Sequence, residues 1–413
     1  GLAAAPLAAR YGNGPSFSES PPRVAVIGAG AFGGWAALHL RELGAEVILI
    51  DAWGPGNARS SSGGKTRVIR AIYGPDRIYS EMVKRAFELW EMIDGSGSEP
   101  LYVETGALWM HRGDDGYLRS SLPILEDLGF PVEKLTLEAA SRRYPQIDFR
   151  GVESVWLEKK AGALRAQRAC VAVRDAFEKA GGSYRTARVA PGPVRNGSLS
   201  SLSLEDGSKI EADLYLFACG PWLGQIFPEV IGERVRPTRQ EVYYFTTPRG
   251  SRRYHAGHLP VWIDFGERIV YGIPEIDADG QTLKVADDTR GEPIDPTTDQ
   301  RIPSQEGIDR ARRFLAERFP ELAQAPLHAG LVCQYENSPD GNLILDRHPE
   351  ATNVWIAGGG SGHGFKLAPV VGEMMAGTLL AGNRIPPAFL LERLRDPARA
   401  TTQFERDNGP ARD

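Results

Sequence analysis

Three glycines near the start of the chain have the spacing of a phosphate-binding turn. Gly28, Gly30 and Gly33 follow the apolar run 24–27, and residues 35–43 then have helical character up to Gly44. In such a turn the first glycine permits the bend, the second lets the backbone approach a pyrophosphate, and the third allows the helix to pack on the strand. The amino end of the helix would face the phosphate charge. This pattern predicts a dinucleotide site.

An acidic residue stands where a dinucleotide site needs one. Asp51 directly follows a second buried apolar run, 47–50. Its carboxylate could accept hydrogen bonds from ribose hydroxyls. Because a predicted strand, the glycines, a helix and this aspartate occur in the expected order, a glycine-rich turn without a ligand is the less favoured interpretation. The pattern does not separate a nicotinamide from a flavin dinucleotide.

Several arginines and cysteines could take part in chemistry, but each could equally be an ordinary surface or core residue. Arg67 and Arg70 would share a face of a helix but not of a strand, and composition alone favours solvated basic residues. Cys333 taken by itself is most often a small buried apolar residue. Cys170 and Cys219 lie in apolar surroundings and are interpreted as core. Three cysteines are too few for a disulfide framework, and they show no metal-ligand spacing, so we expect no metal.

Segments at both ends of the chain resemble the flavoenzymes of the D-amino-acid-oxidase type. The stretches that carry the resemblance are 60–70 and 359–367, and within the sarcosine oxidase and pipecolate oxidase branch the stretches 333–340, 346–349 and 361–372 are especially similar to pipecolate oxidase. The likeness covers roughly residues 23–391 in the same order, so it is more specific than any single motif. It implies FAD as the cofactor and an amino acid as the substrate.

The resemblance implies a substrate site. Arg67 matches an arginine near the flavin ring, and Arg70 and Lys366 match the pair that binds the substrate carboxylate, a role that suits two cations. Tyr271 and Tyr335 match tyrosines that line the substrate cavity, although half-buried strand tyrosines would give the same pattern.

The resemblance also implies a role for a lysine in the reaction with oxygen. Lys284 matches a lysine on the flavin face opposite the substrate. A fixed ammonium there would stabilise the negative charge that develops when O2 reacts with reduced flavin. Composition alone favours a surface lysine at a sheet edge. With this lysine the predicted catalytic set is Lys284, Arg67, Arg70, Lys366, Tyr271 and Tyr335.

A covalent link to the cofactor is implied as well. Cys333 matches the cysteine that is joined through sulfur to the flavin 8-methyl group. Phe365 opens a predicted helix after a glycine run, and its amino end could face the pyrimidine edge of the flavin, although a plain connection is the alternative. The predicted cofactor-binding residues are Gly28, Gly30, Ala31, Phe32, Gly33, Asp51, Ser61, Ser62, Thr66, Arg67, Val189, Cys219, Gly220, Trp222, Cys333, Gly359, Gly362, His363, Gly364, Phe365 and Lys366.

Four positions depart from the family pattern. Asp288 stands where sarcosine oxidase has a histidine over the substrate site. Gly63 and Gly360 replace bulkier residues, and Trp262 replaces a smaller apolar one. These differences argue against sarcosine itself as the substrate and predict a differently shaped cavity.

Apolar runs and turn signals place these residues on elements. Buried strands are predicted at 24–27, 47–50, 214–218 and 354–357, further strands at 102–110 and 184–189, a hairpin around 206–207, and a strand-rich stretch over 242–284. Helices are predicted over 76–93, 165–179, 308–318 and 365–382.

The order of these elements predicts a fold of the α/β plus antiparallel β class, with a discontinuous Rossmann-like FAD-binding domain interleaved with an antiparallel-sheet substrate domain. The FAD-binding parts would be 23–100, 164–231 and 333–391, and the substrate domain 101–163 and 232–332. Residues 1–22 are predicted to be a disordered amino-terminal segment, and 392–413 a carboxyl-terminal tail.

Composition limits the partners. The chain has 413 residues with 48 Lys and Arg against 53 Asp and Glu, so its net charge of −5 disfavours a nucleic-acid partner. No apolar run suits a membrane span. We expect a monomer in the cytoplasm, or an exported protein if residues 1–22 are the remnant of a twin-arginine signal.

The resemblance implies an oxidase that converts the C–N bond of a secondary or N-methyl amino acid to an imine and reduces O2 to H2O2. Two alternatives stay open. The first is an FAD-dependent amino-acid dehydrogenase that passes electrons to another acceptor. The second is a catalytically silent flavin-binding protein, which the presence of Arg70, Lys284 and Lys366 disfavours.

Overall fold

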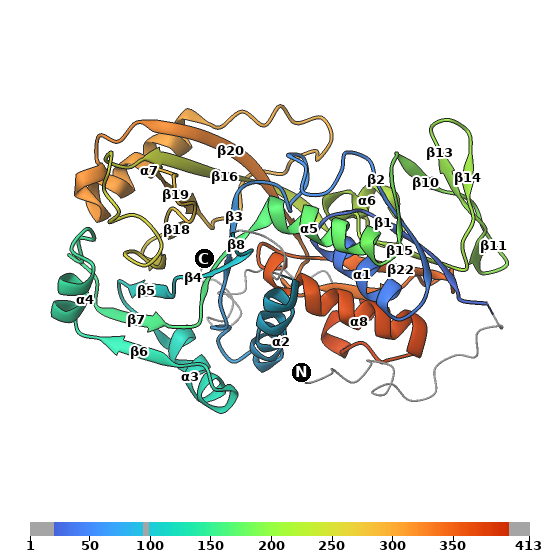
Figure 1. Ribbon diagram of the computed structural model, residues 1–413, viewed down its shortest axis with the longest axis horizontal. Helices are drawn as coiled ribbons and strands as arrows, with labels where there is room; N and C mark the ends of the chain where they lie inside the picture. The colour runs from blue at the N-terminus through green and yellow to red at the C-terminus, as the bar shows by residue number, and fades with distance from the viewer. Residues whose placement is uncertain (1–19, 94–98, 396–413) are drawn as a thin grey trace. The chain divides into compact units, whose positions relative to one another are not determined.

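The computed structural model describes residues 20–93 and 99–395, and the chain divides into two compact units (Figure 1). The predicted terminal segments, 1–22 and 392–413, lie largely outside the described residues. Each unit is assembled from separate stretches of the chain. The first unit contains 20–63, 166–237 and 335–395, and the second contains 64–93, 99–165 and 238–334.

The first unit is built on a six-stranded sheet in the order β21-β22-β15-β1-β2-β9. The strands from β22 to β9 run parallel, and β21 is an antiparallel edge. Near-continuous apolar runs suit such buried strands. The bounds are β1 (Arg23–Ile27), β2 (Glu46–Asp51), β9 (Ser183–Thr186), β15 (Leu214–Phe217), β21 (Ile344–Arg347) and β22 (Val354–Gly358).

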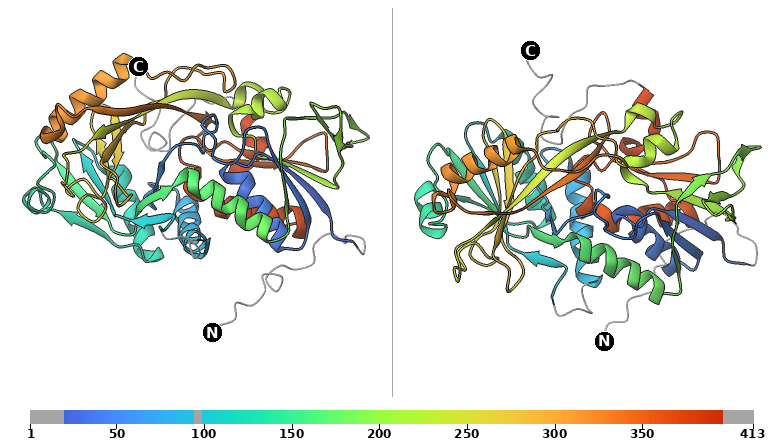
Figure 2. Two further views of the ribbon diagram at one scale, coloured as in Figure 1. Left: turned by 45° about the horizontal axis from the view of Figure 1, so that its top comes forward. Right: turned by 90° about the horizontal axis from the view of Figure 1, so that it is seen from above.

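Three helices accompany this sheet, α1 (Ala31–Glu42), α5 (Ala166–Lys179) and α8 (Ala368–Ala381). Both α8 and α5 pack against α1 (Figures 1 and 2). The α1–α8 contact requires a glycine, because a Cβ at Gly372 would lie 2.6 Å from the Trp35 backbone. The smaller elements of the first unit are β10 (Val189–Pro191), β11 (Val194–Arg195), β12 (Ser198–Leu199), β13 (Leu202–Leu204), β14 (Lys209–Ile210), η2 (Gly220–Trp222), α6 (Leu223–Ile226), η3 (Gly232–Arg234), η5 (Phe365–Leu367), η6 (Pro387–Phe389) and η7 (Leu391–Arg395).

The second unit is built on an eight-stranded, largely antiparallel sheet in the order β20-β16-β19-β18-β17-β5-β7-β6. Its two long strands, β16 and β20, lie side by side in Figure 2. The last three residues of β20 belong to the first unit. The bounds are β5 (Ala107–His111), β6 (Val132–Leu135), β7 (Ser154–Glu158), β16 (Arg236–Thr246), β17 (Val261–Phe265), β18 (Ile269–Ile273), β19 (Thr282–Asp287) and β20 (Leu327–Asn337).

A small sheet and several helices complete the second unit. The sheet has the order β3-β8-β4 and is antiparallel. Its strands are β3 (Thr66–Ile69), β4 (Tyr102–Glu104) and β8 (Gly162–Arg165), and the helices are α2 (Arg77–Ile93), α3 (Gly116–Leu128), α4 (Leu137–Arg143), α7 (Gln305–Arg318) and the short η4 (Pro320–Leu322). Among the described residues, no helix is both long and apolar enough to span a membrane.

The structure confirms the predicted combination of a parallel α/β sheet with an antiparallel sheet, and it changes several details. The strand predicted over 102–110 is broken at Gly106, whose φ is +73°, so β4 and β5 lie in different sheets. Residues 64–100 are predicted to belong to the FAD-binding parts, but their described part groups with the second unit because β3 pairs with β8. The helix α1 begins at Ala31 rather than at residue 35, and a 3-10 turn precedes α8.

A buried histidine gives the second unit a specific sensitivity to acid. His111 on β5 is 1% exposed, and neither ring nitrogen has a hydrogen-bond partner among the described residues. Its ring stacks on Phe265 at 4.8 Å between centroids. Burial lowers the pKa of His111 to about 4, although three nearby aspartates oppose this shift. The unfolded chain therefore binds a proton at a higher pH than the folded chain does.

Through this residue we expect the free energy of unfolding to fall by about 2 kcal/mol between about pH 7.5 and about pH 5, because acid favours the state that binds more protons. Urea unfolding at both values, compared between the wild type and His111→Phe, measures the effect. Between the two pH values, the free energy of unfolding of His111→Phe should fall by about 2 kcal/mol less than that of the wild type. Parallel pH profiles for the two proteins would contradict the prediction.

Candidate active site

The predicted phosphate-binding turn lies at the carboxyl end of β1, and it requires glycine at positions 28 and 33 and is closely packed at position 30. Gly28 has a φ of +104°, and a Cβ there would lie 2.4 Å from the carbonyl oxygen of Ala218. A Cβ at Gly33 would lie 1.9 Å from the carbonyl oxygen of Gly28, and one at Gly30 would lie 3.3 Å from Ser62 Oγ. The turn therefore leaves the backbone uncovered beside the amino end of α1, as a bound pyrophosphate needs.

Hydrogen bonds fix the residues around this turn. Asp51 ends β2, where its Oδ2 accepts from the Ala29 amide at 2.8 Å and its Oδ1 accepts from Trp53 and Gly54, also at 2.8 Å. Burial raises the pKa of Asp51, and these three amides oppose the shift. The carboxylate is thus held at the edge where a ribose is predicted to bind.

A serine of the following loop closes the other side of the turn. The Ala31 amide at the start of α1 donates to Ser62 Oγ at 2.9 Å, and Ser61 precedes it in the loop. Phe32 is buried in the first turn of α1, and a Cβ at Gly364 would lie 2.9 Å from its ring. The turn after β1 therefore lies next to the glycine run that follows β22.

That glycine run is tightly packed. Gly359 and Gly362 have φ values of +69° and +84°, and a Cβ at Gly362 would lie 2.7 Å from the Tyr335 ring. The run lies in the first unit together with the end of β20, so the structure brings Tyr335 and the predicted cofactor loop together.

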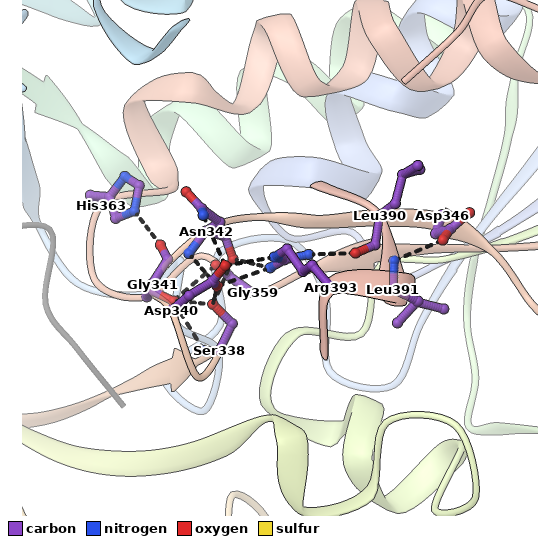
Figure 3. Close-up of polar contacts among 11 residues, drawn as sticks. Ser338, Asp340, Gly341, Asn342, Asp346, Gly359, His363, Leu390, Leu391 and Arg393 are labelled. Atoms are coloured by element: carbon purple, nitrogen blue, oxygen red, sulfur yellow. Dashed lines mark hydrogen bonds and ion pairs between the residues drawn. The ribbon is translucent and has the colours of Figure 1, made fainter. Parts of the chain in front are cut away.

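The 3-10 turn η5, directly before α8, holds a buried lysine. Lys366 is 4% exposed, and its Nζ donates to the carbonyl oxygen of His363 at 2.9 Å. The Nε2 atom of His363 lies 2.9 Å from the carbonyl oxygen of Gly341 (Figure 3). Phe365 lies between them in the sequence and is half-buried. Burial of an ammonium group is costly unless a partner anion or a function compensates for it.

The loop contacted by His363 is anchored by an ion pair. Figure 3 shows Arg393 next to Asp340 and Asn342, with Arg393 Nε 2.8 Å from Asp340 Oδ2. Ser338 Oγ donates to the carbonyl oxygen of Asn342. This arrangement fixes the residues that follow β20.

The remaining predicted cofactor residues of the first unit lie after β15 or at a nearby strand. Gly220 has a φ of +51°, and the Trp222 ring lies 5.0 Å from that of Trp53. Cys219 Sγ donates to the carbonyl oxygen of Ile27 at 3.4 Å, and burial raises the pKa of this thiol. Val189 begins β10 and packs against the apolar core of this unit.

In the second unit, five predicted residues come together, and Thr66 is one of them. Arg67 Nη2 lies 3.5 Å from Cys333 Sγ. Lys284 is 3% exposed on the interior strand β19, and its Nζ donates to the carbonyl oxygen of Thr66 at 3.0 Å. Burial lowers the pKa of Lys284 to about 7, and the Arg67 guanidinium adds to the shift. The Tyr271 ring lies 5.6 Å from Lys284 Nζ. The surface-lysine alternative for Lys284 is therefore wrong.

Arg70 follows β3, so the segment is extended and the two arginines do not share a helix face. Arg70 is buried, and its guanidinium carbon lies 4.7 Å from the Tyr73 ring and 5.4 Å from the Trp109 ring. Glu158 is also buried nearby, and burial raises its pKa to about 7 while Arg70 opposes the shift. Lys366 belongs to the other unit, so its cooperation with Arg70 stays a prediction.

Packing within each unit accounts for two of the departures from the family pattern. Trp262 is fully buried and stacks on Phe314 at 5.3 Å in the apolar core of the second unit, so it fills the core rather than reshaping a cavity. Gly63 is required because a Cβ there would lie 2.4 Å from the carbonyl oxygen of Asn57. Asp288 is half-buried and lies 3.9 Å from Arg290.

Sequence reasoning missed two buried carboxyl groups, Glu158 and Glu336. Glu336 lies inside a stretch that carries the family resemblance, but no pattern in the sequence assigns it a role. Its buried Oε2 has no hydrogen-bond partner among the described residues. A polar residue in a strand that ends at the site is the only signal that could have marked it.

Comparison with known proteins shows that the chain belongs to the DAO family of FAD-dependent oxidoreductases, whose model it matches over residues 23–378. It is 29% identical over 372 residues to monomeric sarcosine oxidase of Arthrobacter sp., which covers 87% of this chain and 92% of that protein. It is 28% identical over 361 residues to N-methyl-L-tryptophan oxidase of Salmonella heidelberg, covering 85% of this chain and 92% of that protein.

The fold is similar to that of a solved relative. L-Proline dehydrogenase from P. horikoshii superimposes with a TM-score of 0.78 at 22% identity, covering 92% of this chain and 99% of that chain. These likenesses confirm the predicted family and fold class. The residues present fit FAD. The glycine turn after β1 is a cradle that a Cβ at position 28 or 33 would fill, and the sheet edge beside it carries a buried carboxyl oxygen that has no partner among the described residues.

Proposed function

We propose that this protein is an FAD-dependent amine oxidase that acts on a secondary or N-methyl amino acid. The observation that carries the proposal is the cluster of Arg67, Cys333 and Lys284 in the second unit, where two cationic groups and a cysteine meet in the part of the chain that matches the family. The names of the relatives support the substrate class, since sarcosine and N-methyltryptophan are both N-methyl amino acids.

When bound, FAD would supply the two-electron acceptor for oxidation of the substrate C–N bond and the electron donor for reduction of O2 to H2O2. The chain's own residues bind and orient the substrate. Arg70 and Lys366 hold the carboxylate, and the rings of Tyr73 and Trp109 keep the Arg70 guanidinium in place. Tyr271 of the second unit and Tyr335 of the first are each proposed to contact the substrate, as their match to the family tyrosines implies. Lys284 can gain or lose a proton near neutral pH, because burial lowers its pKa to about 7.

We also propose that FAD is attached covalently through Cys333. The support is the local sequence, Cys-Gln-Tyr-Glu-Asn-Ser-Pro-Asp, which resembles the attachment site of the family. In addition, Cys333 is half-buried and its Sγ lies beside the Arg67 guanidinium.

The carboxylate assignment predicts a difference between acid and ester substrates. Arg70→Met and Lys366→Met should each weaken binding of the amino acid by roughly 10- to 100-fold, because charge-assisted hydrogen bonds contribute about 1.5–3 kcal/mol each. Binding of the methyl ester, which lacks the anion, should change far less. Dissociation constants from spectral titration under anaerobic conditions measure both. An equal loss for acid and ester would refute the assignment.

Oxygen consumption and H2O2 production across a panel of amines test the proposed function. The panel contains sarcosine, other N-methyl amino acids, proline, pipecolate and D-amino acids, and each is also assayed with an artificial electron acceptor. Stoichiometric H2O2 with a secondary or N-methyl amino acid supports the oxidase. Turnover with the artificial acceptor alone would favour the dehydrogenase.

A further inference from the structure

One carboxyl group at the edge of the parallel sheet has an unpaired oxygen inside the protein. Glu336, near the end of β20, is 7% exposed. Its Oε1 accepts from the Gly360 amide at 3.0 Å, and its Oε2 is buried without a hydrogen-bond partner among the described residues. A buried polar atom left unpaired costs about 1–3 kcal/mol. Such a group in a native protein needs a physical reason, and a ligand that completes the contact is one.

The position of this oxygen identifies the ligand. A Cβ added at Gly220 would lie 3.4 Å from Glu336 Oε2, and one added at Gly358 would lie 3.5 Å from it. These glycines stand at the carboxyl ends of β15 and β22, and β15 pairs with β1, which carries the phosphate-binding turn. Ligands of open parallel sheets bind at this edge. The carboxyl oxygen therefore lies beside the backbone at this edge of the sheet, close to positions 220 and 358 and next to the predicted dinucleotide site.

Charge decides which form of the carboxyl group suits that site. Burial raises the pKa of Glu336 to about 7, against the effect of the Gly360 and Gly359 amides. Two titratable groups in the same region are Asp51 at the end of β2 and the Cys219 thiol after β15, whose pKa is raised by burial and by both Asp51 and Glu336. The loop that contacts Glu336 through the Gly360 amide also carries the buried His363 and Lys366. FAD adds the negative charge of its pyrophosphate. A second carboxylate there would be repelled, whereas a neutral carboxyl group is a hydrogen-bond donor.

We propose that Glu336 contacts bound FAD in its protonated form and donates a hydrogen bond from Oε2 to an acceptor atom of the cofactor. This inference rests on the FAD-dependent function, but not on the identity of the substrate. It accounts for the buried acid on a strand that leads to the site, and for the glycines that surround that acid. Because the contact involves FAD, its test needs no turnover.

The test measures retention of FAD by holoenzyme that carries Cys333→Ser, so that the cofactor can exchange. Equilibrium ultrafiltration gives the Kd for FAD at about pH 6.5 and about pH 9, on either side of the carboxyl titration. In this background Glu336→Gln copies the neutral acid and keeps the acceptor for the Gly360 amide, whereas Glu336→Met removes both polar atoms. The exposed Glu229 of the same unit, changed to Gln, is the matched control.

With Glu336 intact, the Kd should rise at least about tenfold from the lower to the higher pH, because the donor proton is lost. Glu336→Gln should bind FAD with the same Kd at both values, Glu336→Met should bind at least about tenfold more weakly at the lower pH, and Glu229→Gln should behave as the background does. An unchanged pH dependence of the Kd in Glu336→Gln would overturn the proposal, and this holds even if the Met variant fails to fold. A protein that oxidises no amine would contradict the proposed function and leave these FAD measurements intact.

Discussion

Replacing Lys284 by methionine is expected to slow the reaction of the reduced flavin with O2 by orders of magnitude and to leave anaerobic flavin reduction nearly intact. The transfer of electrons to O2 develops negative charge, and a fixed ammonium in a water-poor site stabilises that charge far better than one in bulk water does. Lys284 meets this requirement, since it is buried on an interior strand beside Arg67 and Tyr271.

The pH profile of the same step gives a second readout. Because the pKa of Lys284 is lowered to about 7, the ammonium is present below that pH and is lost above it. The wild-type rate of reoxidation should therefore fall as the pH rises through about 7, and the rate in Lys284→Met should not follow this course. Stopped-flow mixing of reduced enzyme with O2 measures both. Lys159→Met, at an exposed lysine of the same unit, is the control. Equal reoxidation rates in the wild type and Lys284→Met would contradict this role and favour the dehydrogenase.

Changing Cys333 to serine is expected to abolish covalent attachment of the flavin completely. Wild-type protein precipitated with acid should form a yellow pellet, because a thioether survives unfolding whereas non-covalent contacts do not. The Cys333→Ser protein should release its flavin into the supernatant. Cys170→Ala, at a cysteine buried in α5, should keep the yellow pellet. Wild-type flavin found entirely in the supernatant would show that the linkage does not exist.

The parts of the fold that the sequence predicts well are those with one dominant pattern. The apolar runs that form β1, β2, β15 and β22, and the periodic helices α2 and α5, lie within a few residues of their predicted bounds. The stretch 102–110 does not follow its prediction, because its side chains suit a strand throughout and the break depends on the backbone of Gly106 and its contact with the Ala161 carbonyl. That contact is tertiary, and no local pattern reveals it.

The site is predictable where chemistry and spacing coincide, as at Gly28 and Asp51. It is not predictable where a charged residue is buried, because composition places such residues on the surface. Lys284, Glu158 and Glu336 are all buried in strands whose alternation would equally allow an exposed face. The family resemblance supplies Lys284. Only the three-dimensional packing reveals the two glutamates, one beside Arg70 and the other at the edge of the parallel sheet.

The measurement that tests the central claim most directly is anaerobic titration of the holoenzyme with secondary and N-methyl amino acids, observed through the visible absorption of the flavin. The account predicts that at least one of them bleaches the flavin with one equivalent of substrate per flavin, and that its methyl ester does so far less readily. If dithionite reduces the flavin and no amino acid of the panel does, the protein is not an amino-acid oxidase or dehydrogenase of this class, and the silent flavin-binding alternative replaces the account.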